Sequence, residues 1–201
     1  CHHHHYPGQS VERVGRPLDL WSIHFPFPIF SQATLVDALE EAVKEGLAGA
    51  VGVSNYNAQQ MEQAAELLDR RGLVLACNQV KYSLLDRTPE SSGLLQRAAA
   101  LDVAVVAYSP LAGGKLSASS ARAGGDPKVQ ELLKLLEFVG AVNGGRSAAQ
   151  VALNWLVQRG ALPIPGCKTA AQAREAAGAA GWALDDNEVE LVAEKLDYLG
   201  L

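Results

Sequence analysis

Polar and aromatic side chains follow several short apolar segments of this sequence, at positions that a buried core would not favour. They are His24 after Leu-Trp-Ser-Ile, Ser54 and Asn55 after Val-Gly-Val, Gln79 within Asn-Gln-Val-Lys-Tyr, and Tyr108 after Val-Val-Ala. His, Ser, Asn and Gln exchange hydrogen bonds or protons with a ligand, and Tyr adds an aromatic face. The sequence therefore predicts a pocket in which hydrogen-bonding and aromatic groups converge.

The apolar segments alternate with amphipathic stretches, which is the pattern of parallel strands joined by helices. We expect strands at residues 18–24, 48–54, 75–81, 103–108 and 161–165. The first four recur at the step of about 30 residues that is typical of a strand–helix unit. Because the carboxyl ends of parallel strands lie at one rim, the side chains that follow the strands should meet there.

The predicted fold is α/β, a (β/α)8 TIM barrel of which this chain supplies about five units. Five parallel strands leave two open edges with unpaired backbone groups. We expect three further units upstream of this chain, or a protein partner, to cover these edges. We also expect a single domain over residues 1–201, truncated at its N-terminus, with residues 1–9 as a tail.

Local signals mark the helix ends. Three pairs have the spacing of a capping box, and three glycines lie where helices should stop. The pairs are Asn57/Gln60, Ser147/Gln150 and Thr169/Gln172, and the glycines are Gly46, Gly72 and Gly160. The fifth strand comes late, after a Gly/Ser/Ala-rich loop at 112–125 and an extra helix-like stretch at 127–138.

The composition excludes several classes of partner. The formal net charge is −5, and no basic cluster could neutralise successive phosphates of a nucleic acid. No apolar segment approaches the roughly 20 residues of a membrane span. Cys1, Cys77 and Cys167 are scattered, so we expect neither a disulfide framework nor a metal site. The run His2 to His5 suggests a tag remnant or a terminal tail.

Six strings carry a resemblance to a known family: DLWSIHFP (19–26), GVSNY (52–56), NQVKYS (78–83), AYSPL (107–111), ALNW (152–155) and IPG (164–166). In order and spacing they resemble the aldo-keto reductases, and most closely the plastid-type members of plants and green algae. The resemblance covers about residues 10–196. It implies reduction of aldehydes or ketones with NADPH, in the chloroplast or alternatively in the cytoplasm.

The resemblance implies roles for residues of the first four strands. His24 would point at the substrate carbonyl, although a satisfied histidine at a strand end is the alternative. Ser54, Asn55 and Gln79 would hold the carboxamide of the nicotinamide ring, because these side chains match its donors and acceptors. For Ser54 and Asn55 the alternative is an ordinary turn. Tyr108 would stack on the nicotinamide ring.

Further cofactor contacts are implied toward the C-terminus. Ser109 and Leu111 would approach the pyrophosphate. Gly166, Lys168 and Thr169 lead into a helix whose free amides and positive end suit the 2'-phosphate of NADPH. Gln172 and Glu175 match positions that contact this phosphate and the adenine, although the family more often has Arg at the first. An exposed helix start with an ordinary capping box is the alternative, and both remain open.

The chain also departs from the family. The Tyr that donates the proton, the Lys that lowers its pKa and the Asp that pairs with this Lys all precede the His in the family, and none is found here. We expect them upstream of this chain, which alone should be nearly inactive. A catalytically inactive structural or regulatory subunit of a larger complex is the alternative function.

Overall fold

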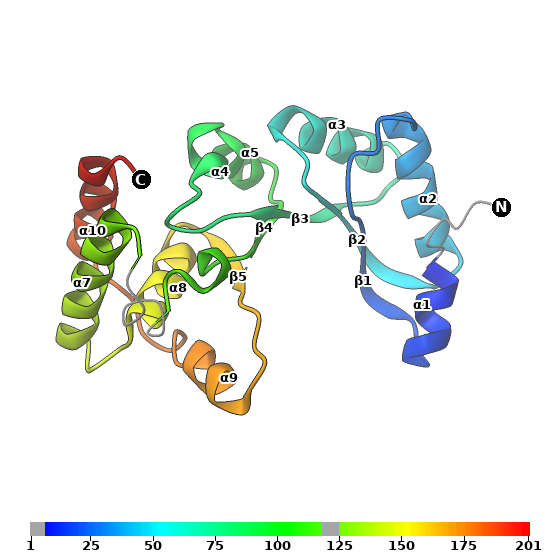
Figure 1. Ribbon diagram of the computed structural model, residues 1–201. Coiled ribbons are helices and arrows are strands. Elements are labelled where there is room, and N and C mark those ends of the chain that lie inside the picture. The colour runs from blue at the N-terminus through cyan, green and yellow to red at the C-terminus, as the bar shows by residue number, and fades with distance from the viewer. Residues whose placement is uncertain (1–6, 118–124) are drawn as a thin grey trace. The chain divides into compact units, whose positions relative to one another are not determined.

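The computed structural model of this protein describes residues 7–117 and 125–201 (Figure 1). The chain divides into two compact units, which are described separately. The first comprises Cys1–Val80 and Glu90–Val105, and the second comprises Lys81–Pro89 and Val106–Leu201.

The first unit is built from strands that alternate with helices. Its elements are α1 (Pro7–Val14), β1 (Leu18–Ile23), α2 (Gln32–Lys44), β2 (Ala48–Ser54), α3 (Ala58–Asp69), all of β3 (Leu75–Lys81) except its last residue, and α5 (Leu94–Ala100). β1 pairs with β2 and β2 with β3, both in parallel. α2 packs against β1, β2 and α3, and α1 contacts β1.

The strand register separates two faces of this sheet. Ile23 is level with Val53, which is level with Asn78, and all three are buried. Because side chains alternate along a strand, the neighbouring residues Ser22, Gly52 and Cys77 share the opposite face. A Cβ added to Gly52 would lie 2.6 Å from Ser22 Oγ and 2.7 Å from Cys77 Sγ, which places these side chains together.

The second unit is mainly helical. It contains the end of β4 (Ala104–Tyr108), a 3-10 turn (Ala112–Gly114), α7 (Pro127–Val142), α8 (Ala148–Gln158), β5 (Ala161–Ile164), α9 (Ala170–Ala177) and α10 (Asp186–Leu199), whereas α4 (Thr88–Ser91) has residues in both units. Every residue of α8 from Ala148 to Leu156 except Gln150 is buried, so this helix forms the core of the unit. Asn154, on α8, donates to the carbonyls of Ala179 and Trp182.

The strands confirm the prediction closely. β2 and β3 have the expected bounds, and the other three differ by one residue at one end. The sheet order is β1-β2-β3-β4-β5, the order of the strands in the sequence. Crossover helices that return each new strand beside the previous one produce this order.

The helix ends confirm the capping signals. All three predicted capping boxes form, at α3, α8 and α9. Gly46, Gly72 and Gly160 adopt φ values of 67°, 71° and 80°, the left-handed conformation that ends a helix.

Three expectations differ from the structure or lie outside it. α7 continues four residues beyond the expected helix end at 138, to Val142. α1 begins at Pro7, whereas a tail was expected as far as residue 9. The His run, Cys1 and residues 118–124 of the long loop lie outside the described residues.

Across residues 7–117 and 125–201, no helix combines the length and apolarity that crossing a membrane requires. Within the same ranges, no cluster of three His, Cys, Asp or Glu side chains could hold a metal ion.

The tight approach at Gly52 yields a stability prediction. Gly52→Ala should lower the free energy of unfolding by about 1–3 kcal/mol, the usual cost of overpacking. Besides the two side chains, the new methyl would lie 3.1 Å from the carbonyl oxygen of Cys77, which the sheet holds in place. Gly49→Ala is the matched control on the same strand, because its nearest neighbour would be the carbonyl oxygen of Asp19 at 3.4 Å. Urea unfolding followed by circular dichroism measures both, and equal effects of the two substitutions would contradict the packing argument.

Candidate functional site

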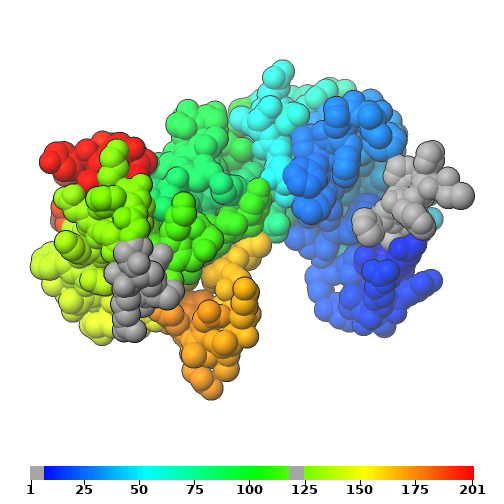
Figure 2. All heavy atoms as spheres, viewed as in Figure 1, coloured from blue at the N-terminus to red at the C-terminus, as the bar shows by residue number. Residues whose placement is uncertain are grey.

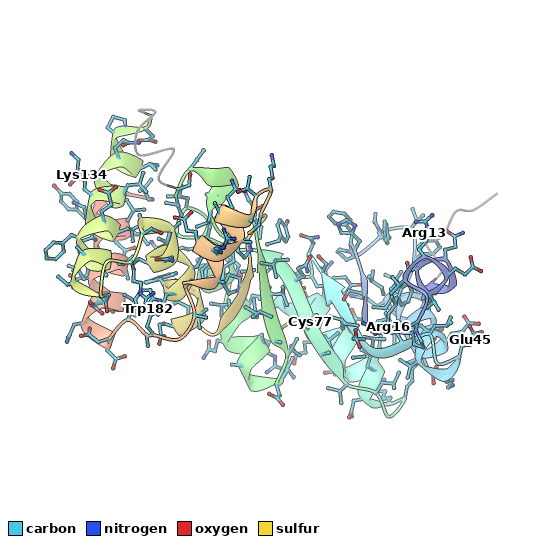
Figure 3. All side chains as sticks on the ribbon, turned by 90° about the horizontal axis from the view of Figure 1, so that it is seen from below. Arg13, Arg16, Glu45, Cys77, Lys134 and Trp182 are labelled. Carbon is cyan, nitrogen blue, oxygen red and sulfur yellow. The ribbon has the colours of Figure 1, made fainter. Side chains whose placement is uncertain are left out.

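Three of the predicted site residues lie in one row across the first unit. The register pairs Ser54 with Gln79. On β1, Ile23 pairs with Val53, and His24 follows Ile23 directly at the bend that ends the strand. His24, Ser54 and Gln79 therefore follow one another along the carboxyl ends of β1, β2 and β3, and strand alternation puts Ser54 and Gln79 on the face that also carries Cys77, labelled in Figure 3.

The turn after β2 ties these three strand ends together. Ser54 Oγ donates to the Gln79 carbonyl at 2.8 Å, and the Asn55 backbone N–H donates to the same oxygen at 2.9 Å. Asn55 Nδ2 donates to the His24 carbonyl at 3.0 Å and to Ser54 Oγ at 3.1 Å. The backbones of His24 and Gln79 are thus both linked to the Ser54-Asn55 turn.

The hydrogen-bond inventory of this network leaves capacity for a ligand. A hydroxyl has one proton and two lone pairs. Ser54 Oγ gives its proton to Gln79 and accepts from Asn55, so one lone pair remains to accept from an amide N–H. The half-buried side-chain amide of Gln79 lies outside the network and carries both a donor and an acceptor. The site can therefore pair with a carboxamide.

His24 lies at an exposed aromatic cluster. Its ring stacks on that of Phe25, with centroids 4.4 Å apart and planes inclined by 18°. Phe27 meets Phe25 edge-on, and 46% of Phe25 and 42% of Phe27 are exposed. A polar ring beside open apolar surface suits a ligand with one hydrogen-bonding group and an apolar remainder.

The second unit contains the predicted residues at the end of β4 and directly after it. Tyr108 is the last residue of β4 and is half-buried, and its carbonyl accepts from the Tyr82 N–H at 3.3 Å. Ser109 is exposed with a φ of 52°, and Leu111 is half-buried. Tyr82 itself is fully buried against Trp155, with an edge contact of 6.4 Å between ring centroids, so it belongs to the core.

The start of α9 is occupied by its own capping box. Gln172 Oε1 accepts from the backbone N–H groups of Lys168 at 2.7 Å and Thr169 at 3.2 Å. The backbone N–H of Gln172 in turn donates to Thr169 Oγ1 at 3.2 Å. The capping alternative is thus what forms, and a phosphate here would have to displace the Gln172 side chain or use other amides.

The surroundings of α9 remain open to solvent. None of its residues is buried, and Figure 2 shows this orange segment projecting from the second unit. Gly166 and Lys168 are exposed, and Glu175 is half-buried with its carbonyl accepting from Gln150 Nε2 at 2.9 Å. Roles for these residues, Thr169 and Gln172 in cofactor binding stay predictions.

Sequence reasoning missed two buried neighbours of the turn. Asn78 is fully buried and donates through Nδ2 to the Tyr56 carbonyl at 2.9 Å. The Tyr56 side chain is only 1% exposed, and its hydroxyl is buried without a hydrogen-bond partner among the described residues. The signal in the sequence that could have indicated them is a polar residue, Asn78, where the neighbouring strands have the apolar residues Ile23 and Val53.

Burial also sets the ionisation of two groups. It raises the pKa of Tyr56 to about 12, because the phenolate would lose its hydration. It raises the pKa of the Cys77 thiol as well, although a hydrogen bond with Ser22 offsets part of this. Cys77 is consequently a packed, unreactive thiol rather than a nucleophile.

The family model described as "Aldo/keto reductase family" matches residues 8–197. The chain is 33% identical over 191 residues to the chloroplastic pyridoxal reductase of Arabidopsis thaliana, covering 89% of this chain and 52% of that protein. It is 31% identical over 186 residues to the 6-dehydroglucose reductase of Novosphingobium aromaticivorans, covering 90% and 58%. The chain thus spans between half and three-fifths of the length of these relatives.

A solved structure agrees. The crystal structure of a thermostable aldo-keto reductase, Tm1743, matches with a TM-score of 0.78 and 29% sequence identity, over 94% of this chain and 64% of that one. This confirms the predicted fold class: the chain supplies five strand–helix units of a (β/α)8 barrel.

The buried hydroxyl of Tyr56 yields a pH prediction. In the unfolded chain a tyrosine ionises near pH 10, whereas Tyr56 in the folded protein ionises near 12. Stability from the protonated form is therefore complete below pH 10 and is lost as the pH rises toward 12. Tyr56→Phe should remove this alkaline loss and leave the free energy of unfolding at pH 7 unchanged or raised by up to about 1 kcal/mol, since the hydroxyl has no partner.

The measurement is chemical unfolding of both proteins at a series of pH values. Tyr198→Phe, at a side chain that is 80% exposed, is the control. If Tyr56→Phe and the parent protein lost stability equally between pH 10 and 12, the assignment to Tyr56 would be wrong.

Proposed function

This chain belongs to the aldo/keto reductase family, and we propose that it serves the NADPH-dependent reduction of aldehyde or ketone carbonyls. The observation that carries the proposal is the row of His24, Ser54 and Gln79, joined through the Asn55 turn. The names of both relatives describe reductases, which supports the reaction class. The reaction is proposed for the whole protein, of which these residues form a part.

The donor set fits the nicotinamide carboxamide. Ser54 Oγ retains an acceptor position, and Gln79 adds an amide donor and acceptor beside it. Asn55 holds this arrangement against the His24 carbonyl. When bound, NADPH supplies the hydride that reduces the carbonyl carbon. These three residues would fix the orientation of the nicotinamide ring before the reaction. This lowers the entropic part of the activation barrier.

His24 is assigned to the substrate. It follows β1, the strand paired with that of Ser54, and its ring would donate a hydrogen bond to the carbonyl oxygen, which orients the carbonyl and polarises it. Phe25 and Phe27 supply apolar surface for the remainder of the substrate. The proton that the reduced oxygen requires is assigned to the Tyr, Lys and Asp that the family places before this histidine, outside residues 1–201.

Residues of the second unit are assigned to further contacts with the cofactor. Tyr108 would stack on the nicotinamide, and Ser109 and Leu111 would approach the pyrophosphate. The position of Tyr108 at the end of β4 supports its assignment. Lys168 and its neighbours Gly166, Thr169, Gln172 and Glu175 are assigned to the 2'-phosphate and the adenine, supported by the exposed cation at the start of α9.

A chloroplast location is part of the same proposal. Its support is the Arabidopsis relative, whose name includes the word chloroplastic.

Gln79→Leu tests the function. It keeps the length of the side chain but removes both hydrogen-bonding groups offered to the carboxamide. The affinity for NADPH should fall by about three- to tenfold, the effect of losing one net hydrogen bond. Titration of NADPH fluorescence measures this.

Gln59→Leu, on the exposed surface of α3, is the matched control and should bind NADPH as the parent does. Equal affinities of the Gln79 variant and the parent would contradict the assignment. A parent protein that binds no NADPH would instead favour a structural or regulatory subunit.

A further inference from the structure

Asn78 places a polar side chain in a buried apolar row. Its neighbours on the same face, Ile23 and Val53, are 7% and 0% exposed, and Asn78 is 0% exposed. Nδ2 donates to the Tyr56 carbonyl, but Oδ1 is buried without a partner among the described residues. An apolar side chain would avoid the desolvation of this amide. What Asn78 adds over an apolar side chain is therefore its hydrogen bond to the Tyr56 carbonyl, which requires a donor.

That bond anchors a turn with an unfavourable backbone conformation. Asn55 has a φ of 62°, in the left-handed region that Asn adopts more readily than other residues with a Cβ but still at a cost. Such a conformation persists when its surroundings determine it from both sides. On the N-terminal side, Ser54 Oγ and the Asn55 N–H both bond to the Gln79 carbonyl. On the C-terminal side, Asn78 holds the Tyr56 carbonyl.

The two anchors come from consecutive residues of β3. Because consecutive side chains alternate, Gln79 faces the candidate site and Asn78 faces the covered side of the sheet. A single strand thus supplies a ligand-facing residue and, directly before it, a residue that clamps the turn from behind.

We propose that Asn78 is a positioning residue: by holding the Tyr56 carbonyl it fixes the left-handed turn at Asn55, and so presents Ser54 and Asn55 to the nicotinamide carboxamide. The inference rests on the proposed function. Without the clamp, the backbone at Asn55 relaxes toward ordinary φ values, and the bonds from Asn55 to the His24 carbonyl and from Ser54 to the Gln79 carbonyl lose their alignment. Only the nicotinamide half of the cofactor is affected, because the adenosine half is assigned to other residues.

Asn78→Leu tests this with two ligands. One is NADPH, and the other is 2'-phospho-ADP-ribose, which has the same adenosine half but no nicotinamide. The affinity for NADPH should fall by about three- to tenfold, as expected for one lost net hydrogen bond, while the affinity for the fragment stays the same. Leu68→Ala, at a fully buried position on α3, is the control for general destabilisation and should change neither affinity. Equal loss for both ligands, or no loss for either, would overturn the positioning role.

A second measurement needs no cofactor. The Asn55 N–H donates to the Gln79 carbonyl, so its hydrogen exchange reports whether the turn is closed. In Asn78→Leu this amide should exchange about tenfold faster relative to the other amides of β2, and in Leu68→Ala the ratio should stay unchanged. An unchanged ratio in Asn78→Leu would overturn the clamp. If the parent protein bound no NADPH, the proposed function would fail while this ratio still decided the part played by Asn78.

Discussion

The parallel register of β1, β2 and β3 is the constraint on which the candidate site depends. Side chains along a strand alternate between two faces, so a slip of one residue would exchange them. Ser54 and Gln79 would turn into the covered face, and Asn78 would turn out of it. The register therefore determines at once which residues face a ligand and which ones support them from behind.

Packing on both faces fixes this register. Ile23 and Val53 bury apolar surface on the covered face. The hydrophobic effect therefore favours the observed register over registers shifted by one residue. On the other face, only a glycine at position 52 leaves room for Ser22 and Cys77 to approach each other. The hydrogen bonds of the Asn55 turn are then made between groups that the sheet already holds in place. These hydrogen bonds cost little additional conformational entropy, and they keep the site rigid.

Much of this arrangement was predictable from the sequence, because its signals are local. Apolar, β-branched segments gave β2 and β3 their bounds, and the pair Asn57/Gln60 predicted the start of α3. Because parallel strands end at a common rim, the sequence was enough to predict that His24 and Ser54 lie close together.

The remainder depends on contacts between distant segments. Tyr82 lies at a strand end, as Tyr108 does, yet it is buried against Trp155, which no local pattern indicates. The clamp from Asn78 to Tyr56 joins residues 22 positions apart, and a motif shows only that both are present. At α9 the sequence allowed either a capping box or a phosphate seat, and Gln172 forms the capping box.

The central claim is that the row of His24, Ser54 and Gln79 receives the reacting end of the cofactor, and a crystal structure of the protein with NADP⁺ tests it most directly. The account predicts that the nicotinamide carboxamide lies within hydrogen-bonding distance of Ser54 Oγ and the Gln79 side chain, with the ring on the face of the sheet that carries His24. A nicotinamide ring bound away from this row, with Ser54 and Gln79 making no contact to it, would contradict the account.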